Sequence, residues 1–424
     1  MNPPENVDQY AVMRARAMLL GSGRPSYRQE VEACRVLAKV SPLTYLPRLV
    51  RALLMLSYQP EFRDRPQECL AVCEESLAAA RLVEAGEPKR LELLADALNA
   101  CQRELYRLGR REDGFAVREE MAGVGRQAYE SGQVASPVYG LGPLAAALAE
   151  EGRHSEAADA YGRIVEAERA KDGKHRVRDW SLINWAAALD AAGQHDAALA
   201  AFGELVMATR NEFEAGTTSL SILAWELMRF SEMLDAHGQH ADACAVRLEV
   251  GVLLAELART GERKSWSNIT AWWVVLLGLS GRSDERPAPG EPAPPFGSHM
   301  GWSPDLRVSY LEGRSAIEAA IASLAPLAQD DPHRYLAELV TLQRRLTIRS
   351  AIHWQWRTHR ILEPLQPMFD QGVTLARRLL KVDADQGRAT LARALTDRSM
   401  LFVAGRQYAE AHADFQEAAA NRNA

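Results

Sequence analysis

Apolar residues recur along almost the whole chain at the spacing of one face of a helix. A representative stretch places Leu91, Leu94, Ala95 and Leu98 at positions i, i+3, i+4 and i+7. Strict alternation of apolar and polar residues, which is typical of half-buried strands, is almost absent. Ala, Leu, Glu and Arg, all good helix formers, dominate the composition. The pattern predicts an all-α protein.

Turn signals divide these helical stretches at regular intervals. The turns are centred on glycines spaced by 43, 41, 45 and 43 residues, namely Gly109, Gly152, Gly193, Gly238 and Gly281. Repetition at a fixed period of this size is typical of solenoid proteins. Glycine can adopt the positive φ that ends a helix. We therefore expect each of these glycines to separate the two antiparallel helices of a hairpin.

The positions around the turn glycines repeat as well. Five residues after three of them stands an alanine, Ala157, Ala198 or Ala243, and Gly114 takes this place after Gly109. Small residues at these positions allow the two helix axes of a hairpin to approach closely. The residues before the glycines repeat as apolar, apolar, small and apolar, for example Leu182, Trp185, Ala186 and Leu189.

These repeated positions resemble the tetratricopeptide repeat (TPR) family. The matching segments are LGPLAAALAEEGRHSEAADAYGRI and LINWAAALDAAGQHDAALAAFGEL. The resemblance implies a TPR-like α-solenoid of antiparallel helix hairpins, with long units of 41–45 residues in place of the usual 34 or so. A helix-start cassette with proline occurs twice, at Ser41-Pro42 and Asp331-Pro332, and is similar to TPR arrays of actinobacterial type.

A proline-rich stretch interrupts the array. Residues 282–304 contain six prolines, which are incompatible with a continuous helix. We therefore expect residues 1–281 to form an N-terminal TPR-like solenoid and residues 282–304 to form a loop or linker. Residues 305–424 are expected to form a C-terminal helical block that ends in a TPR-like hairpin around Gly405.

Composition and charge narrow the class of protein. The 424 residues are 47% hydrophobic and 25% charged, which is ordinary for a folded protein, and the net charge of −6 disfavours a nucleic-acid-binding protein. Five cysteines, an odd number, argue against a disulfide framework and for a reducing compartment. The N-terminus has no continuous apolar export segment, and the longest apolar run, 269–279, is too short to span a membrane. We expect a cytoplasmic protein.

No arrangement of residues indicates catalysis. The sequence lacks G-x-S-x-G, H-E-x-x-H and P-loop motifs, so we expect a protein that is not an enzyme and needs no cofactor. Cys69 and Cys73 share a helix face, and His237 and His240 are close in sequence, so either pair could ligate a metal. The cysteines instead fall on core positions of the repeat, and His240 shares its position, two residues after the turn glycine, with His154 and His195. We therefore expect no metal site.

The TPR resemblance implies that the first helix of each hairpin lines a binding groove. One column, thirteen residues before the turn glycines, contains Asp96, Tyr139, Trp180, Trp225 and Asn268. Tyr and Trp supply large contact areas with a polar tip, which suits peptide binding. The alternative is that these side chains pack against neighbouring helices. The predicted partner-binding residues are Asp96, Asn99, Arg103, Tyr139, Trp180, Trp225, Met228, Glu232 and Asp235.

A basic stripe is the second candidate surface. Arg345, Arg349, His353 and Arg357 recur every four residues on one face of a long predicted helix. The stripe could contact an acidic protein, a membrane surface or, less favourably, a nucleic acid. It could also pair internally with acidic residues such as Asp383 and Asp385, or remain solvated.

Together these patterns predict a non-catalytic scaffold or adaptor that binds a peptide or protein segment in its concave groove. The alternative is a regulatory sensor that binds a small peptide or metabolite and switches a partner protein. An enzyme with an unrecognised helical active site is a third class. The identity of the partner and the oligomeric state are not indicated by the sequence.

Overall fold

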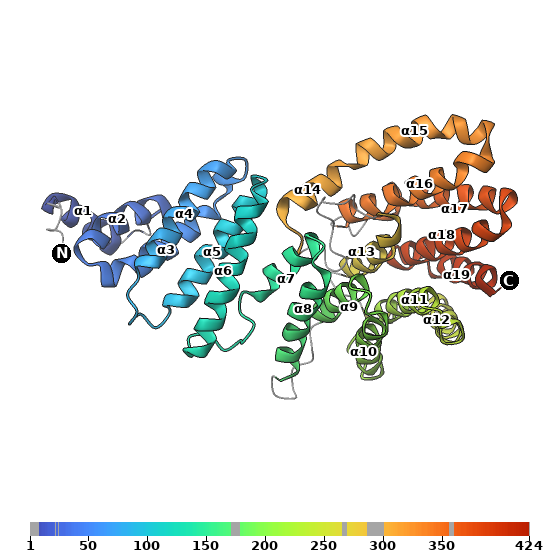
Figure 1. The fold of residues 1–424 in the computed structure, drawn as a ribbon, viewed down its shortest axis with the longest axis horizontal. Coiled ribbons are helices and arrows are strands. Elements are labelled where there is room, and N and C mark those ends of the chain that lie inside the picture. Colours follow the sequence, from blue (N-terminus) through green and yellow to red (C-terminus); the bar gives the residue numbers. More distant parts are fainter. Residues whose placement is uncertain are drawn as a thin grey trace. The chain divides into compact units, whose positions relative to one another are not determined.

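The structure, a computed structural model, is built of α-helices in its described residues (Figure 1). It describes residues 8–21, 23, 25–170, 179–264, 269–285, 301–355 and 360–423. Within these ranges the regular elements are all helical, and consecutive helices pack in pairs as in a TPR-like repeat. The predicted all-α, TPR-like fold is therefore confirmed.

The chain divides into two compact units. One comprises residues 1–148, 159–176 and 303–305. Inside it, α2 packs on α3, α3 on α4, α4 on α5 and α5 on α6, and the first helices α3 and α5 also touch each other. Its helices are α1 (Gln9–Leu20), α2 (Tyr27–Val40), α3 (Pro42–Ser57), α4 (Pro66–Leu82), α5 (Arg90–Arg107) and α6 (Arg111–Glu130), with the 3-10 turn η1 (Pro60–Phe62).

The other unit comprises residues 149–158, 177–302 and 306–424. Helices α7 (Leu141–Glu150), α8 (His154–Arg169) and α14 (Pro304–Glu312) are shared between the two units. The second unit further contains α9 (Asp179–Ala191), α10 (His195–Glu214), α11 (Leu220–Ala236), α12 (His240–Thr260), α13 (Ile269–Ser280), η2 (Arg282–Asp284), α15 (Arg314–Asp330), α16 (Pro332–Trp354), α17 (Leu362–Val382), α18 (Ala384–Ala404) and α19 (Tyr408–Asn423).

The predicted helix-ending glycines have the expected backbone. Gly109, Gly152, Gly193 and Gly238 have φ between 71° and 77°. After α5, the Gly109 N–H donates to the Tyr106 carbonyl and the next N–H donates to the Leu105 carbonyl. This pair of bonds is the Schellman motif, which satisfies two carbonyls that the helix end would otherwise leave without partners.

Gly281 differs from this expectation, because its φ is −78°. It leads into the 3-10 turn η2 and does not end a helix with a left-handed residue. A Cβ at this position would lie 2.7 Å from Cδ1 of Ile348 on α16. A side chain here would press on Ile348 of α16, a contact that the repeat pattern does not contain.

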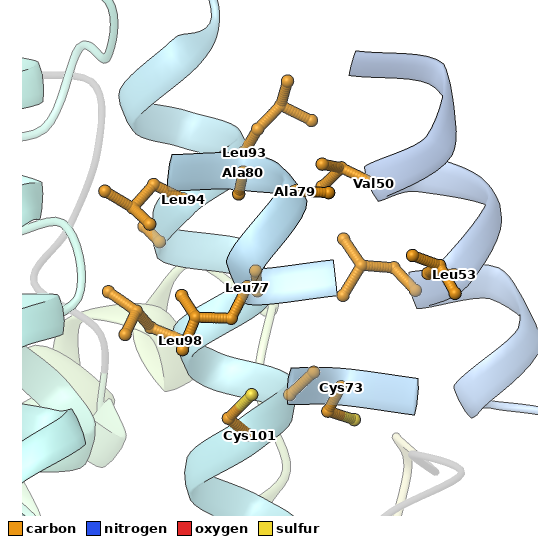
Figure 2. Packing of buried hydrophobic residues seen from close by; sticks show 14 of the residues in the cluster. Val50, Leu53, Cys73, Leu77, Ala79, Ala80, Leu93, Leu94, Leu98 and Cys101 are labelled. Carbon is orange, nitrogen blue, oxygen red and sulfur yellow. The ribbon is translucent and has the colours of Figure 1, made fainter. Parts of the chain in front are cut away.

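The core of the first unit forms where α3, α4 and α5 interdigitate. Figure 2 shows Val50 and Leu53 of α3 facing Leu77 of α4, with Leu98 of α5 beyond. Such a three-helix contact buries apolar surface that a single hairpin would leave in water.

Cys69 and Cys73 belong to this core, as the repeat register predicted, and Cys34 and Cys101 lie in it as well. Cys34, Cys69, Cys73 and Cys101 are buried free thiols, and Cys244 is half-buried. A hydrogen bond with Cys101, together with burial, raises the pKa of Cys73 to about 12, and burial raises the pKa of Cys34 to about 11. These thiols are therefore protonated near neutral pH and behave as small apolar side chains.

The predicted domain boundary at residues 282–304 stays a prediction, because residues 286–300 lie outside the described part of the chain. On either side of that stretch, α13 packs against α16 and α18 within one unit. In the part of the chain that is described, none of the helices is both long enough and apolar enough to cross a membrane.

The first testable prediction concerns Gly114, which holds the place of the repeat alanine in α6. A Cβ there would lie 2.8 Å from the ring of Tyr106, which is fully buried with the Arg118 guanidinium 4.0 Å from its centroid. We expect Gly114→Ala to lower the free energy of unfolding by about 1–3 kcal/mol through overpacking. Urea denaturation followed by circular dichroism measures this.

Gly123→Ala in the same helix is the matched control. A Cβ at Gly123 meets no atom within 4 Å. This change should raise stability by up to about 1 kcal/mol, because alanine favours helix over glycine. Equal effects of the two substitutions would contradict the tight Gly114–Tyr106 contact.

Candidate functional site

In the first unit, α3 and α5 present a continuous surface of side chains, which we call the α3–α5 face. Along α3, the exposed residues Arg51, Met55 and Tyr58 lie at i, i+4 and i+7. Along α5, the exposed residues Asp96 and Asn99 and the half-buried Arg103 lie at i, i+3 and i+7. The α3–α5 face is defined by these residues and by Tyr139, so it contains Arg51, Met55, Tyr58, Asp96, Asn99, Arg103 and Tyr139.

Two contacts join the α3–α5 face across its elements. The Arg103 guanidinium lies 4.7 Å from the centroid of the Tyr58 ring, which links α5 to the end of α3. The Tyr139 hydroxyl donates to Oδ1 of Asp96 at 3.1 Å, which links α5 to the segment before α7. The sequence placed Asp96 and Tyr139 in one column, and the structure brings them into direct contact.

Gly125 of α6 makes the position of Tyr139 possible. A Cβ at Gly125 would lie 1.9 Å from the Tyr139 carbonyl oxygen, so only glycine lets this backbone approach α6. Desolvation and the neighbouring Asp96 carboxylate raise the pKa of Tyr139 to about 12. Desolvation also raises the pKa of Asp96, against the hydrogen bond from Tyr139. The tyrosine therefore remains a neutral donor at physiological pH.

The charges at the other end of the face are partly compensated. Glu104 is buried, and its carboxylate lies 2.6 Å from Nη1 of Arg107 and 3.4 Å from Nε of Arg103. Arg51 is exposed one turn before Met55. This end of the face is therefore positive at its surface and has an aromatic and a thioether side chain between two arginines.

The remaining predicted residues of the column lie in the second unit. Trp180 of α9 is half-buried, and its ring stacks on Trp272 of α13 with centroids 4.6 Å apart. Trp225 and Met228 of α11 are completely buried, with 0% of each residue exposed. Trp225 Nε1 donates to the Met400 carbonyl of α18 at 3.1 Å. Trp225 and Met228 therefore pack against neighbouring helices and do not line an open groove.

Glu232 and Asp235 of α11 are engaged by arginines of the same chain. Arg422 of α19 reaches Glu232 at 3.2 Å and Asp235 at 3.1 Å, and Arg247 of α12 also pairs with Asp235. Burial raises the pKa of Glu232, but the charges of Arg422 and Arg229 outweigh it and the net shift is downward. Helices α18 and α19 thus cover the face of α11 that the repeat pattern assigned to a partner.

The residues of the basic stripe differ in their surroundings. Arg349 pairs with Glu285 at 2.8 Å and donates to the Tyr310 carbonyl at 3.0 Å, so its partners are not the acidic residues Asp383 and Asp385 named from the sequence. Arg345 is half-buried and His353 is exposed. Arg357 lies outside the described residues.

The repeat pattern did not single out Arg344 of α16, which joins three elements of the second unit. Its guanidinium donates to Asp397 of α18 at 2.7 Å, to the Ser280 hydroxyl of α13 at 2.6 Å, and to Asp284. Burial lowers the pKa of Arg344, but the carboxylates of Asp397 and Asp284 outweigh this effect, and the net shift is upward. The guanidinium therefore stays charged. A signal was present, because Arg344 is in register with the buried residues Val340 and Thr347.

A small pocket of about 70 Å³ lies beside this arginine, between α16, α17 and α18. Its walls are mainly apolar, with Val340, Phe369 and Ala394 among them, and Arg344 and Asp397 supply polar groups. The pocket is a place in the second unit where a small ligand would find both apolar and charged contacts.

No protein-family model matches the chain, and no curated protein sequence matches it. Among solved structures, BtubC (BKLC) from P. vanneervenii is similar with a TM-score of 0.42 and 16% identity, covering 61% of this chain and 97% of its own. A kinesin light chain candidate from Podosopora anserina with nearly identical TPR-like repeats has a TM-score of 0.40 and 19% identity, covering 51% of this chain and 100% of its own.

A singly substituted form of the same P. anserina protein has a TM-score of 0.39 and 19% identity, covering 50% of this chain and 98% of its own. Similarities this weak do not establish a family or a function for this chain. The all-α repeat fold stands on the packing of its own helices.

The second testable prediction separates packing from partner binding at the tryptophan column. Trp225→Ala should lower the free energy of unfolding by about 3–5 kcal/mol, because it leaves a cavity between α11 and α18. Trp180→Ala should cost less, because Trp180 is only half-buried and loses mainly its stacking on Trp272, worth about 0.5–1.5 kcal/mol beyond burial. Chemical denaturation of both variants without any partner measures the difference. A smaller loss for Trp225→Ala than for Trp180→Ala would argue against the buried position of Trp225.

Proposed function

We propose that the protein is a non-catalytic scaffold that binds a protein segment on its α3–α5 face. Helical-repeat folds generally present extended surfaces to other proteins. The observation that carries the proposal is the contrast between equivalent helices. The first helices α3 and α5 keep a face on which Met55 and Tyr58 are 44% and 50% exposed, whereas α11 packs against α18 and is ion-paired to Arg422 of α19.

The side chains of the α3–α5 face suit recognition of a peptide. Tyr and Arg are the residue types that most often dominate binding energy, and Met adapts to irregular apolar partners. Arg51 and Arg103 flank Met55 and Tyr58 through the helix register and the Arg103–Tyr58 contact. We therefore expect a segment with an apolar or aromatic anchor next to an acidic residue.

The alternative, a sensor for a small peptide or metabolite, would use the pocket beside Arg344. That pocket measures about 70 Å³. Sites for small-molecule ligands usually occupy about 300–1,000 Å³. In addition, Asp284 and Asp397 already pair with Arg344, so a charged ligand would have to displace an internal ion pair. The α3–α5 face is the better-supported site.

The third testable prediction is made with the double variant Tyr58→Ala/Arg103→Ala of the full chain. Peptides selected from a random display library on the purified protein should carry the apolar–acidic pattern. Their affinity for the double variant should fall by about 2 kcal/mol, roughly 30-fold, as expected for hot-spot residues. Fluorescence anisotropy of labelled peptides measures this, and thermal denaturation checks that the fold is intact.

Arg126→Ala/Tyr129→Ala is the matched control, because it removes the same two residue types from α6, the second helix of the hairpin. Both of these residues are exposed. Peptide affinity should be unchanged in this control. Failure to select any peptide, or equal losses in the two double variants, would refute the assignment of the α3–α5 face.

A further inference from the structure

Two histidines and an aspartate from three helices converge in the second unit. Asp190 lies in the last turn of α9, His195 is the first residue of α10, and His237 caps the end of α11. The turn at Gly193 brings the first two together, because its Schellman bonds fold α10 back on α9. His237 arrives from the next hairpin.

The ring nitrogens of both histidines contact the same carboxylate oxygen. His195 Nδ1 is 3.0 Å and His237 Nε2 is 3.1 Å from Oδ1 of Asp190. The two rings stack with centroids 4.2 Å apart, and the three potential ligand atoms all lie within 4.8 Å of one another. Ligand atoms about 2.0–2.1 Å from one metal ion are separated by about 2.9–3.4 Å at bond angles of roughly 90–110°.

We propose that Asp190, His195 and His237 bind a divalent first-row transition-metal ion, such as Zn²⁺. Two imidazoles and one carboxylate are donors that these metals prefer. The side chains are 26%, 50% and 17% exposed, so the ion can enter from solvent. Three protein ligands leave at least one coordination position for water or for a donor from a partner.

The repeat itself provides an internal comparison. Asp235 and His240 occupy the same positions one unit later, and His240 Nδ1 lies 3.2 Å from Oδ1 of Asp235. The Asp–His pair is therefore a recurring turn contact. The residue that would complete it in that unit, at the position of His237, is Ser280, whose hydroxyl donates to the Leu277 carbonyl. Asp190 therefore contacts two imidazoles, those of His195 and His237, whereas Asp235 contacts only the imidazole of His240 among these three histidines.

Two arginines, Arg282 and Arg229, lie near Asp190 and add positive charge next to the proposed site. Arg282 donates to the Ala187 carbonyl at 2.9 Å and lies 3.4 Å from Oδ2 of Asp190, the oxygen that does not contact the histidines. It can fix the orientation of the carboxylate, as an outer-shell partner does, although its charge opposes a cation. Arg229, also near Asp190, is paired with Glu232 at 3.2 Å.

A bound ion would join neighbouring hairpins. It would connect the α9–α10 turn to the end of α11, which are already linked by the contacts of both histidines with one carboxylate oxygen. Metal binding to the folded protein stabilises it in proportion to ion occupancy, provided that the unfolded chain binds less well. The stability of the contact between these hairpins would then depend on the concentration of the metal ion.

The fourth testable prediction uses the full chain, freed of any affinity tag and of metal by chelation. Isothermal titration with Zn²⁺ should give one ion per chain, and Co²⁺ should produce visible absorption bands with the same stoichiometry. His195→Gln and His237→Gln should each weaken Zn²⁺ binding by at least about tenfold. His240→Gln, which alters the equivalent pair without a third ligand, should bind as the original protein does.

Thermal denaturation provides the second measurement. Zn²⁺ should raise the melting temperature of the original protein and of His240→Gln, and it should leave His195→Gln and His237→Gln almost unchanged. Circular dichroism verifies that all variants remain helical. The proposal is overturned if the original protein binds no Zn²⁺ or Co²⁺ at millimolar concentration, or if binding survives both substitutions or is lost equally in His240→Gln.

Discussion

Each helix hairpin of this protein has an apolar face that only a neighbouring helix can cover. Val50 and Leu53 of α3 are buried because α4 and α5 lie against them, and Leu98 of α5 is buried from the other side. Because each hairpin depends on the next one, the folding of a repeat array is cooperative mainly between neighbouring hairpins. The positions of the tight turns, the small residues and the core cysteines all follow from it.

The same constraint determines where a partner can bind. In the second unit, α18 and α19 cover the first helix α11, so its tryptophan, methionine and acidic residues satisfy contacts within the chain. In the first unit, α3 and α5 keep an accessible row of aromatic, thioether and charged side chains. Identical repeat positions therefore serve as core in one unit and as surface in the other.

Polar side chains define the contacts between hairpins that apolar packing leaves unspecified. Arg344 joins α13, α16 and α18 through paired and hydrogen-bonded groups, and such a buried charge is costly unless all its partners are in place. The Asp190 carboxylate has a similar role at the junction of α9, α10 and α11, where it receives two imidazoles. These contacts favour one register of hairpin on hairpin over neighbouring registers.

The sequence by itself determined the helical fold, four of the left-handed turn glycines, the helix starts at Pro42 and Pro332 and the burial of Cys69 and Cys73. These features are local, because helical periodicity and a positive φ depend on residues within about one or two turns. Tertiary structure alone decided that Trp225 is buried and that His237 meets His195 and not its sequence neighbour His240. Trp225 and Met400 are 175 residues apart, and such a contact leaves no trace in the local pattern because it depends on how later hairpins fold back on earlier ones.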